Sequence, residues 1–121
     1  MKLKRVYSKH FPFSGFLALT ICPWVFIREK AKERYTEKAD RHETTHGLQQ
    51  IETLWILFFV WYGIEWLIKW FFCGFDSHRA YKSISLEQEA YYNEEDTEYN
   101  NIRKHYAWIK YIFKFYNKST L

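Results

Sequence analysis

The sequence predicts a single α+β domain that is mostly helical, with a short β-hairpin packed on one helix and two or three further helices. With 121 residues, the chain has the length of one domain, taken as residues 1–121. One apolar stretch near the N-terminus is rich in residues that favour strands. Several later stretches carry helical caps or apolar residues at helical spacing, and they occupy most of the chain.

The β-hairpin is predicted at residues 13–28, FSGFLALTICPWVFIR. The length of this apolar stretch and its interruption by Pro23 favour two short strands or a bent hairpin over a helix. Pro23 fits an edge position or the turn, because proline cannot donate to a central strand. The preceding residues are basic but lack the apolar segment and cleavage site of a signal peptide. The charged residues 29–41 are typical of a solvated turn leading into a helix.

The run His42-Glu43-Thr44-Thr45-His46 is the most informative motif in the chain. Residues four apart lie on one face of a helix, so two imidazoles at this spacing can bind one metal ion such as Zn²⁺. Glu43 lies about 100° around the helix, where it can act as a general base without being a ligand. Thr36 is a suitable N-cap for this helix. The motif therefore predicts a helix that carries the site of a zinc hydrolase.

A second helix is predicted at residues 54–75, LWILFFVWYGIEWLIKWFFCGF. This stretch is long enough to cross a bilayer, which takes about 20 residues. Glu65 and Lys69 are costly at membrane depth, although their spacing lets them pair along one helix face. We expect a helix with one side on the domain and the other in the membrane interface, and a spanning helix is the alternative. Gly74 and Asp76 are predicted to end it.

Two more helices are predicted in the C-terminal part of the chain. Residues 83–97 offer Ser85 as an N-cap, with Gln88 three positions later as in a capping box. Residues 98–116 are predicted to form an amphipathic basic helix, because apolar side chains recur at helical spacing: Ile102, Tyr106, Ile109 and Phe113. Core packing is the first interpretation of this stripe, and membrane attachment is the alternative.

A catalytic zinc site normally has three protein ligands and one open position, so the motif needs a third ligand. Acidic candidates lie downstream: Glu65, Glu87, Glu89, Glu94 and Glu95. Glu65 could come from the next helix, but on one continuous helix it would lie about 28 Å from His46. Glu87 opens a separate helix that can fold back against the motif helix, and there the helix N-terminus would keep its carboxylate ionised.

The pairing of RHETTH with a later SLEQEA resembles the gluzincin peptidases, most of all the family of CAAX-processing and HtpX-type membrane proteases. In that family the third ligand is the glutamate three residues before the alanine of an E-x-x-A-D run. The resemblance therefore implies Glu87 as third ligand, with Ala90 as the alanine. The family's Asp is replaced here by Tyr91, and Glu89 or Asp96 is the candidate to support a ligand in its place.

A second resemblance covers residues 41–112. The segments HETTHGLQQ, WYGIEWLI and ISLEQEAYYNE are similar to those of a group of small H-E-x-x-H proteins from bacteria and phages. This resemblance implies a minimal zincin-like fold and brings no substrate with it. Gln49 and Gln50 can hydrogen-bond a ligand or a substrate, and Tyr81 and Tyr91 are candidates to stabilise an oxyanion.

Composition points to a membrane surface as a partner. Aromatic residues make up 22% of the chain, which is more than a small core needs, and the net charge is +4. Basic residues interleaved with Tyr and Trp suit anionic lipid. They would also suit a nucleic acid, but the chain carries no nucleic-acid-binding motif, so no such partner is expected.

The sequence thus predicts a zinc-dependent metallopeptidase, membrane-associated or cytoplasmic, that hydrolyses a peptide or protein substrate. His42, His46 and Glu87 are the expected Zn²⁺ ligands, and Glu43 is the expected catalytic base. Glu89, Gln50 and Tyr91 are candidates for residues that contact the metal ligands and orient them. The alternative is a catalytically inactive, membrane-associated interaction protein whose metal site is structural or vestigial.

Overall fold

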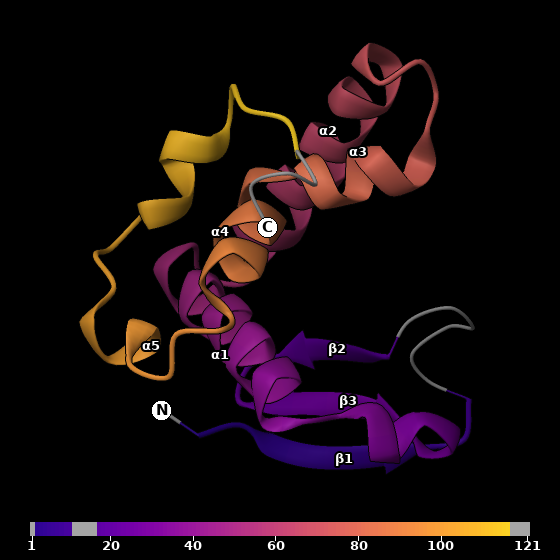
Figure 1. Ribbon diagram of the computed structural model, residues 1–121, viewed down its shortest axis with the longest axis vertical. Helices are drawn as coiled ribbons and strands as arrows, with labels where there is room; N and C mark the ends of the chain where they lie inside the picture. The colour runs from indigo at the N-terminus through magenta and orange to yellow at the C-terminus, as the bar shows by residue number, and fades with distance from the viewer. Residues whose placement is uncertain (1, 11–16, 117–121) are drawn as a thin grey trace.

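The computed structural model describes residues 2–10 and 17–116. The fold is α+β and mostly helical, as predicted, with one small sheet and a succession of helices. Figure 1 shows the three strands together at one end of the molecule and helices α2 and α3 at the other. Helices α1 and α4 lie between these two ends, and the metal centre described below is built on this pair.

The sheet contains β1 (Lys4–Ser8), β2 (Ala18–Ile21) and β3 (Trp24–Arg28) in the order β1-β3-β2. Strands β2 and β3 are antiparallel and turn at Cys22 and Pro23, which confirms the predicted hairpin over 18–28. Residues 13–16 of the predicted hairpin lie outside the described residues. Strand β1 pairs with β3 in parallel and was not predicted. Its basic, mostly exposed residues lack the alternation that marks a half-buried strand.

The motif helix is α1 (Glu37–Glu52), which follows a short 3₁₀ helix, η1 (Glu29–Arg34). Thr36 caps α1 as predicted, because its hydroxyl accepts a hydrogen bond from the Ala39 N–H. Gln50 joins α1 to the sheet: its amide accepts from the Cys22 N–H at 2.6 Å and donates to the Thr20 carbonyl at 2.6 Å. This contact places the motif helix along strand β2.

Helix α2 (Ile56–Phe72) is separated from α1 by a sharp bend of 112°. The bend occurs at Leu54 and Trp55, whose φ angles are 56° and 57°, in the left-handed region. The Trp55 indole N–H donates to the Cys22 carbonyl and fixes the bend against the hairpin. Glu65 is therefore not on the same continuous helix as the motif. In the described part of the chain, no single helix is long and apolar enough to cross a membrane, although α1 and α2 taken as a bent pair would be.

Helix α3 (Ser77–Ser83) was not predicted, and it leads directly into α4 (Ser85–Asn93). Asp76 caps α3, whereas the sequence suggested only that it ends the preceding helix. The predicted capping role of Ser85 is wrong, because the N-cap position of α4 belongs to Ile84. The Glu65 carboxylate takes over that role by accepting from the Ser85 N–H at 2.7 Å and from the Ser85 hydroxyl at 2.6 Å.

The predicted amphipathic helix over 98–116 is also wrong. This part of the chain forms only a single turn, α5 (Tyr99–Ile102), and a 3₁₀ helix, η2 (Ala107–Tyr111). Glu52 interrupts helix formation, since its carboxylate accepts from the Tyr106 backbone N–H at 2.8 Å and from Arg103. Tyr106 itself has a φ of 60°, which is not compatible with a helix interior. A small core joins η2 to the helices: Phe58, Ile84, Leu86 and Trp108.

Candidate metal centre

Helices α1 and α4 bring His42, His46 and Glu87 together into one buried group that could hold a metal ion. The two histidines lie one turn apart on α1, and Glu87 lies in the first turn of α4, which packs across α1. The Nε2 atoms of His42 and His46 are 3.0 Å and 3.1 Å from the same oxygen, Oε1 of Glu87. Candidate ligand atoms of all three side chains lie within 4.8 Å of one another.

The second ring nitrogen of His42 is held by Glu94. The distance between His42 Nδ1 and Glu94 Oε2 is 2.7 Å, so the Nδ1–H donates to the carboxylate and the Nε2 atom faces Glu87. A carboxylate behind the histidine fixes the ring orientation and makes the imidazole a better metal ligand. The ring of Tyr91 packs edge-on against His42, with 4.4 Å between ring centroids.

The second ring nitrogen of His46 is held by Gln49. The distance between His46 Nδ1 and Gln49 Oε1 is 2.8 Å. The amide of Gln49 can only present its oxygen to His46, because its nitrogen donates to the Leu86 carbonyl at 3.0 Å and to Glu89 at 2.9 Å. Glu89 is fixed in turn by Arg103 at 2.7 Å. Both imidazoles are thus oriented from behind, with their Nε2 atoms directed to one point.

Glu87 is positioned by a tyrosine from α2. The Tyr62 hydroxyl donates to Oε2 of Glu87 at 2.6 Å, while Oε1 faces the two histidines. The two carboxylate oxygens therefore have different roles. One accepts from the phenol, and the other faces the imidazoles, which suits a ligand that binds through a single oxygen.

The electrostatics of the cluster follow from its burial and its opposite charges. Burial alone lowers the pKa of His42, but hydrogen bonds to Glu87 and Glu94 outweigh it and raise the pKa to about 10. The pKa of His46 is also raised, because the charge of Glu87 outweighs burial. Burial would raise the pKa of Glu87, but His46 and His42 hold it well below its ordinary value. Glu87 and each histidine stabilise one another's charged forms, whereas the charge of His42 lowers the pKa of His46.

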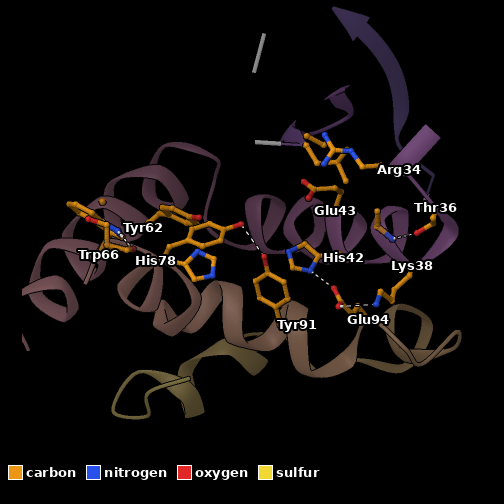
Figure 2. Close-up of a pocket in the computed structure, with 16 residues that line it drawn as sticks. Arg34, Thr36, Lys38, His42, Glu43, Tyr62, Trp66, His78, Tyr91 and Glu94 are labelled. Atoms are coloured by element: carbon orange, nitrogen blue, oxygen red, sulfur yellow. Dashed lines mark hydrogen bonds and ion pairs between the residues drawn. The ribbon is translucent and has the colours of Figure 1, made fainter. Parts of the chain in front are cut away.

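Glu43 lies beside the cluster and contacts strand β2. Its Oε1 accepts a hydrogen bond from the Thr20 hydroxyl at 2.7 Å. Burial raises the pKa of the Glu43 carboxyl, although the neighbouring His46 and His42 oppose the shift. In the close-up of Figure 2, His42 lies between Glu43 and Glu94, so the base candidate and the supporting carboxylate are on opposite sides of the ring.

Two cavities reach this group of residues. A cavity of about 930 Å³, shown in Figure 2, is lined among others by His42, Glu43 and Tyr62. A smaller cavity of about 310 Å³ is lined among others by Glu43, His46 and Glu87, together with apolar side chains of β2 and α2. Glu43 therefore lines both cavities, and each histidine lines one of them. A molecule in either cavity would lie next to the candidate ligands.

The other predicted candidates do not belong to the group of three side chains, although Gln50 and Tyr91 line the cavities beside it. Glu65 pairs with Lys69 at 2.8 Å and does not join the histidines, and Glu89 affects His46 only through Gln49. Gln50 bonds to the hairpin and contacts neither histidine by a hydrogen bond. Tyr91 packs on His42, and its hydroxyl pairs with that of Tyr81 at 3.2 Å.

Two contacts of the site were not predicted. The sequence suggests Glu94 only as a candidate ligand, whereas the structure places it behind His42. The sequence does not point to Tyr62, since nothing in a tyrosine on an apolar helix indicates that its hydroxyl meets a carboxylate from another helix. The spacing did predict Gln49 as a hydrogen-bond partner of a ligand or substrate, because it lies three residues after His46 on the same helix, and its amide oxygen meets the His46 ring.

Comparisons with protein-family models, with curated proteins and with solved structures found no match for this chain. The resemblances to gluzincin peptidases and to small H-E-x-x-H proteins therefore remain predictions from the motifs alone.

Proposed function

We propose that this protein is a zinc-dependent metallopeptidase. One observation carries the proposal: both Nε2 atoms of the H-E-x-x-H motif approach the same Glu87 oxygen at 3.0 Å and 3.1 Å, with Glu43 beside them in the cavity wall. The cluster is formed by segments 41 residues apart in sequence, as measured from His46 to Glu87. It is the arrangement that a zinc hydrolase of this motif requires.

The donor set favours zinc over other common ions. Two imidazole nitrogens and one carboxylate oxygen suit Zn²⁺, whereas Mg²⁺ and Ca²⁺ prefer oxygen ligands. Three protein ligands leave one position open, as in catalytic zinc sites. A zinc ion held there would polarise the scissile carbonyl and lower the pKa of a bound water towards 7.

Side chains of the protein would then transfer the proton and keep the ligands in position. Glu43 would take a proton from the attacking water and pass it to the leaving amine. Its Oε1 is fixed by the Thr20 hydroxyl, which leaves Oε2 for this proton transfer. His42 and His46 would keep their orientation through Glu94 and Gln49. Tyr62 would keep Glu87 from turning its second oxygen towards the ion.

Strand β2 offers a place for an extended peptide. It is an edge strand of the sheet, and its residue Ala18 lines both cavities. A peptide can add to such an edge through backbone hydrogen bonds. Gln50 already occupies the Thr20 carbonyl and the Cys22 N–H, so the available part of the edge runs from Thr20 towards Ala18.

The test combines metal content with hydrolysis. Purified protein is expected to contain about one zinc per chain by elemental analysis and to digest casein or a peptide library. Glu43→Gln should retain the zinc and lower kcat roughly 100- to 10,000-fold, since it removes the general base. Glu95→Gln is the matched control, because Glu95 is exposed and pairs at the surface with Lys38.

The outcomes separate the proposal from its alternatives. Full activity in Glu43→Gln would remove Glu43 as the base, and protein that binds no zinc would overturn the proposal. Zinc binding without turnover on any substrate would favour the second function, an inactive interaction protein with a structural metal. The cavities beside His42 and His46 favour the catalytic function, because a structural zinc site needs no opening.

A further inference from the structure

Glu89 on α4 is a buried carboxylate that takes no direct part in the proposed reaction. It is 0% exposed, and donors meet both of its oxygens. Oε1 accepts from the Gln49 amide at 2.9 Å and from Nη2 of Arg103 at 2.9 Å. Oε2 accepts from the Tyr99 hydroxyl at 2.6 Å and from Nε of Arg103 at 2.7 Å. A carboxylate held by the fork of an arginine has one fixed orientation.

Arg103 is itself fixed against the motif helix. Its side chain is 5% exposed, and Nη1 and Nη2 donate to the Glu52 carboxylate at 3.1 Å and 3.3 Å. Helix α5, which precedes Arg103, lies beside α1 (Figure 1). Its Asn100 accepts from the Thr45 hydroxyl at 2.7 Å and donates to the Arg41 carbonyl at 3.0 Å. Contacts at both ends of α1 therefore hold the guanidinium in place.

These contacts determine which way the Gln49 amide faces. The amide nitrogen carries two hydrogens, which it donates to the Leu86 carbonyl at 3.0 Å and to Glu89 at 2.9 Å. A carbonyl and a carboxylate can only accept, so turning the amide over would place its oxygen against two acceptors. The oxygen is thus kept on the other side, where it lies 2.8 Å from Nδ1 of His46.

The direction of this amide decides which nitrogen of His46 can bind an ion. An acceptor at Nδ1 keeps a hydrogen there and leaves the lone pair of a neutral ring on Nε2. A donor at Nδ1 would move the hydrogen to Nε2, which could then no longer act as a ligand. His42 has no such ambiguity, because its Nδ1 faces the Glu94 carboxylate directly. An amide, by contrast, can face either way unless its other contacts prevent it.

We propose that Glu89 and Arg103 are positioning residues of the metal centre. They hold the nitrogen of Gln49 on their own side, which keeps a hydrogen on Nδ1 of His46 and leaves Nε2 for the ion. The inference rests on the proposed function, since it concerns a ligand of the same metal site. The hydrogen on Nδ1 can nevertheless be observed in protein without metal.

The test follows the Nδ1–H of His46 by ¹⁵N NMR of the full chain, first without metal and then with zinc. In the wild-type protein we expect slow exchange of this hydrogen with water in both states. Glu89→Gln keeps the shape of the side chain but adds a donor next to Gln49, so the amide can turn over. Exchange should become about tenfold faster, because Nδ1 loses its acceptor. Zinc affinity, titrated against a chromophoric chelator, should fall about 10- to 100-fold.

Two controls separate positioning from a general loss of stability. His42 is an internal control in the same spectrum, because Glu94 holds its Nδ1–H and this signal should not change. Glu65→Gln is the matched variant, since it also removes a buried carboxylate, one that pairs with Lys69 on α2. We expect it to leave both the exchange at His46 and the zinc affinity unchanged.

Arg103→Lys tests the same contact from its other partner and decides the matter if circular dichroism shows that Glu89→Gln does not fold. Lysine keeps the positive charge but cannot hold both Glu89 oxygens with one planar fork. Exchange of the His46 hydrogen should again become faster, and zinc binding should weaken about tenfold, at the lower end of the range for such contacts.

Each outcome decides the inference. Faster exchange at His46 with weaker zinc binding, in Glu89→Gln or Arg103→Lys but not in Glu65→Gln, supports it. An unchanged His46 hydrogen in either variant, if folded, overturns it, and so does an equal change in Glu65→Gln. Wild-type protein that binds no zinc but keeps the slowly exchanging Nδ1–H, which Glu89→Gln loses, would overturn the proposed function and still support the positioning role.

Discussion

Two of the buried groups of ionisable side chains in residues 2–10 and 17–116 differ in what surrounds them. His42, His46 and Glu87 face two cavities and direct their Nε2 and Oε1 atoms to one point. Glu65 and Lys69 are enclosed by Ser85 and by backbone carbonyls, which use their hydrogen-bonding capacity. Burial of charge therefore does not identify a functional site by itself. Access from a cavity, together with atoms left available for a ligand, makes the difference.

The largest effect is expected for a substitution that breaks the buried ion pair of Glu65 and Lys69. Lys69→Met should lower the free energy of unfolding by about 3–5 kcal/mol, because it leaves Glu65 charged and buried without its partner. Urea denaturation followed by circular dichroism measures this. The double variant Glu65→Gln, Lys69→Met should recover part of the loss, since the amide oxygen can still accept from Ser85. A loss below about 1 kcal/mol for Lys69→Met would show that the pair is not enclosed as described.

Removal of the Glu87 carboxylate, which faces a cavity, should weaken metal binding. Glu87→Ala should weaken zinc binding more than about 100-fold. Even mutation of a residue that only hydrogen-bonds to a metal ligand weakens metal affinity about 10- to 100-fold, and loss of a ligand itself should cost more. A competition titration against a chromophoric chelator measures the affinity, and Glu95→Ala serves as the control. Unchanged zinc affinity in Glu87→Ala would reassign the third ligand to another carboxylate, with Glu89 the nearest candidate along α4.

A smaller effect is expected for the residue that orients His42. Glu94→Ala should weaken zinc binding about 10- to 100-fold while leaving the zinc stoichiometry at saturation unchanged. The reason is that His42 loses the acceptor for its Nδ1–H but keeps its Nε2 atom as a ligand. The same chelator titration applies. Loss of stoichiometric binding would indicate that Glu94 is itself a ligand.

The smallest effect is expected from a change in pH, which should change the zinc affinity about tenfold per pH unit. The pKa of His42 is raised from 6.5 to about 10, so the metal-free protein gains stability that is complete below pH 6.5 and lost towards pH 10. Zinc must displace this proton, so zinc affinity should rise with pH over the same range. Titration calorimetry in buffers of different ionisation enthalpy should detect the released proton. A pH-independent affinity between pH 6 and 8 would contradict the assigned protonation of His42.

The sequence predicts the part of the site that lies within one helix. His42, Glu43 and His46 are fixed by the period of α1, and Thr36 begins that helix by a local hydrogen bond. Glu87 followed from a family resemblance and from the idea that a separate helix can fold back. Glu94 and Tyr62 depend on how α4 and α2 pack against α1, and local spacing carries no information about that packing.

The failed predictions share one physical cause, which is a tertiary contact that overrides a local preference. Ser85 has the residue type of an N-cap, but Glu65 from another helix performs that function. Residues 98–116 have helical spacing, but Glu52 binds the backbone of Tyr106 and Arg103 and breaks the helix. Strand β1 exists because β3 provides an edge for it, although its own side chains show no strand pattern.

The chain of contacts behind the two histidines has a consequence for how the protein would acquire and release an ion. His42, His46 and Glu87 are joined to one another and to Glu94, Gln49 and Tyr62 by hydrogen bonds that need no metal. Small zinc domains unfold when a chelator strips them. Here the same hydrogen bonds would hold the three side chains together before an ion binds, so we expect a chelator to remove the ion without unfolding the chain.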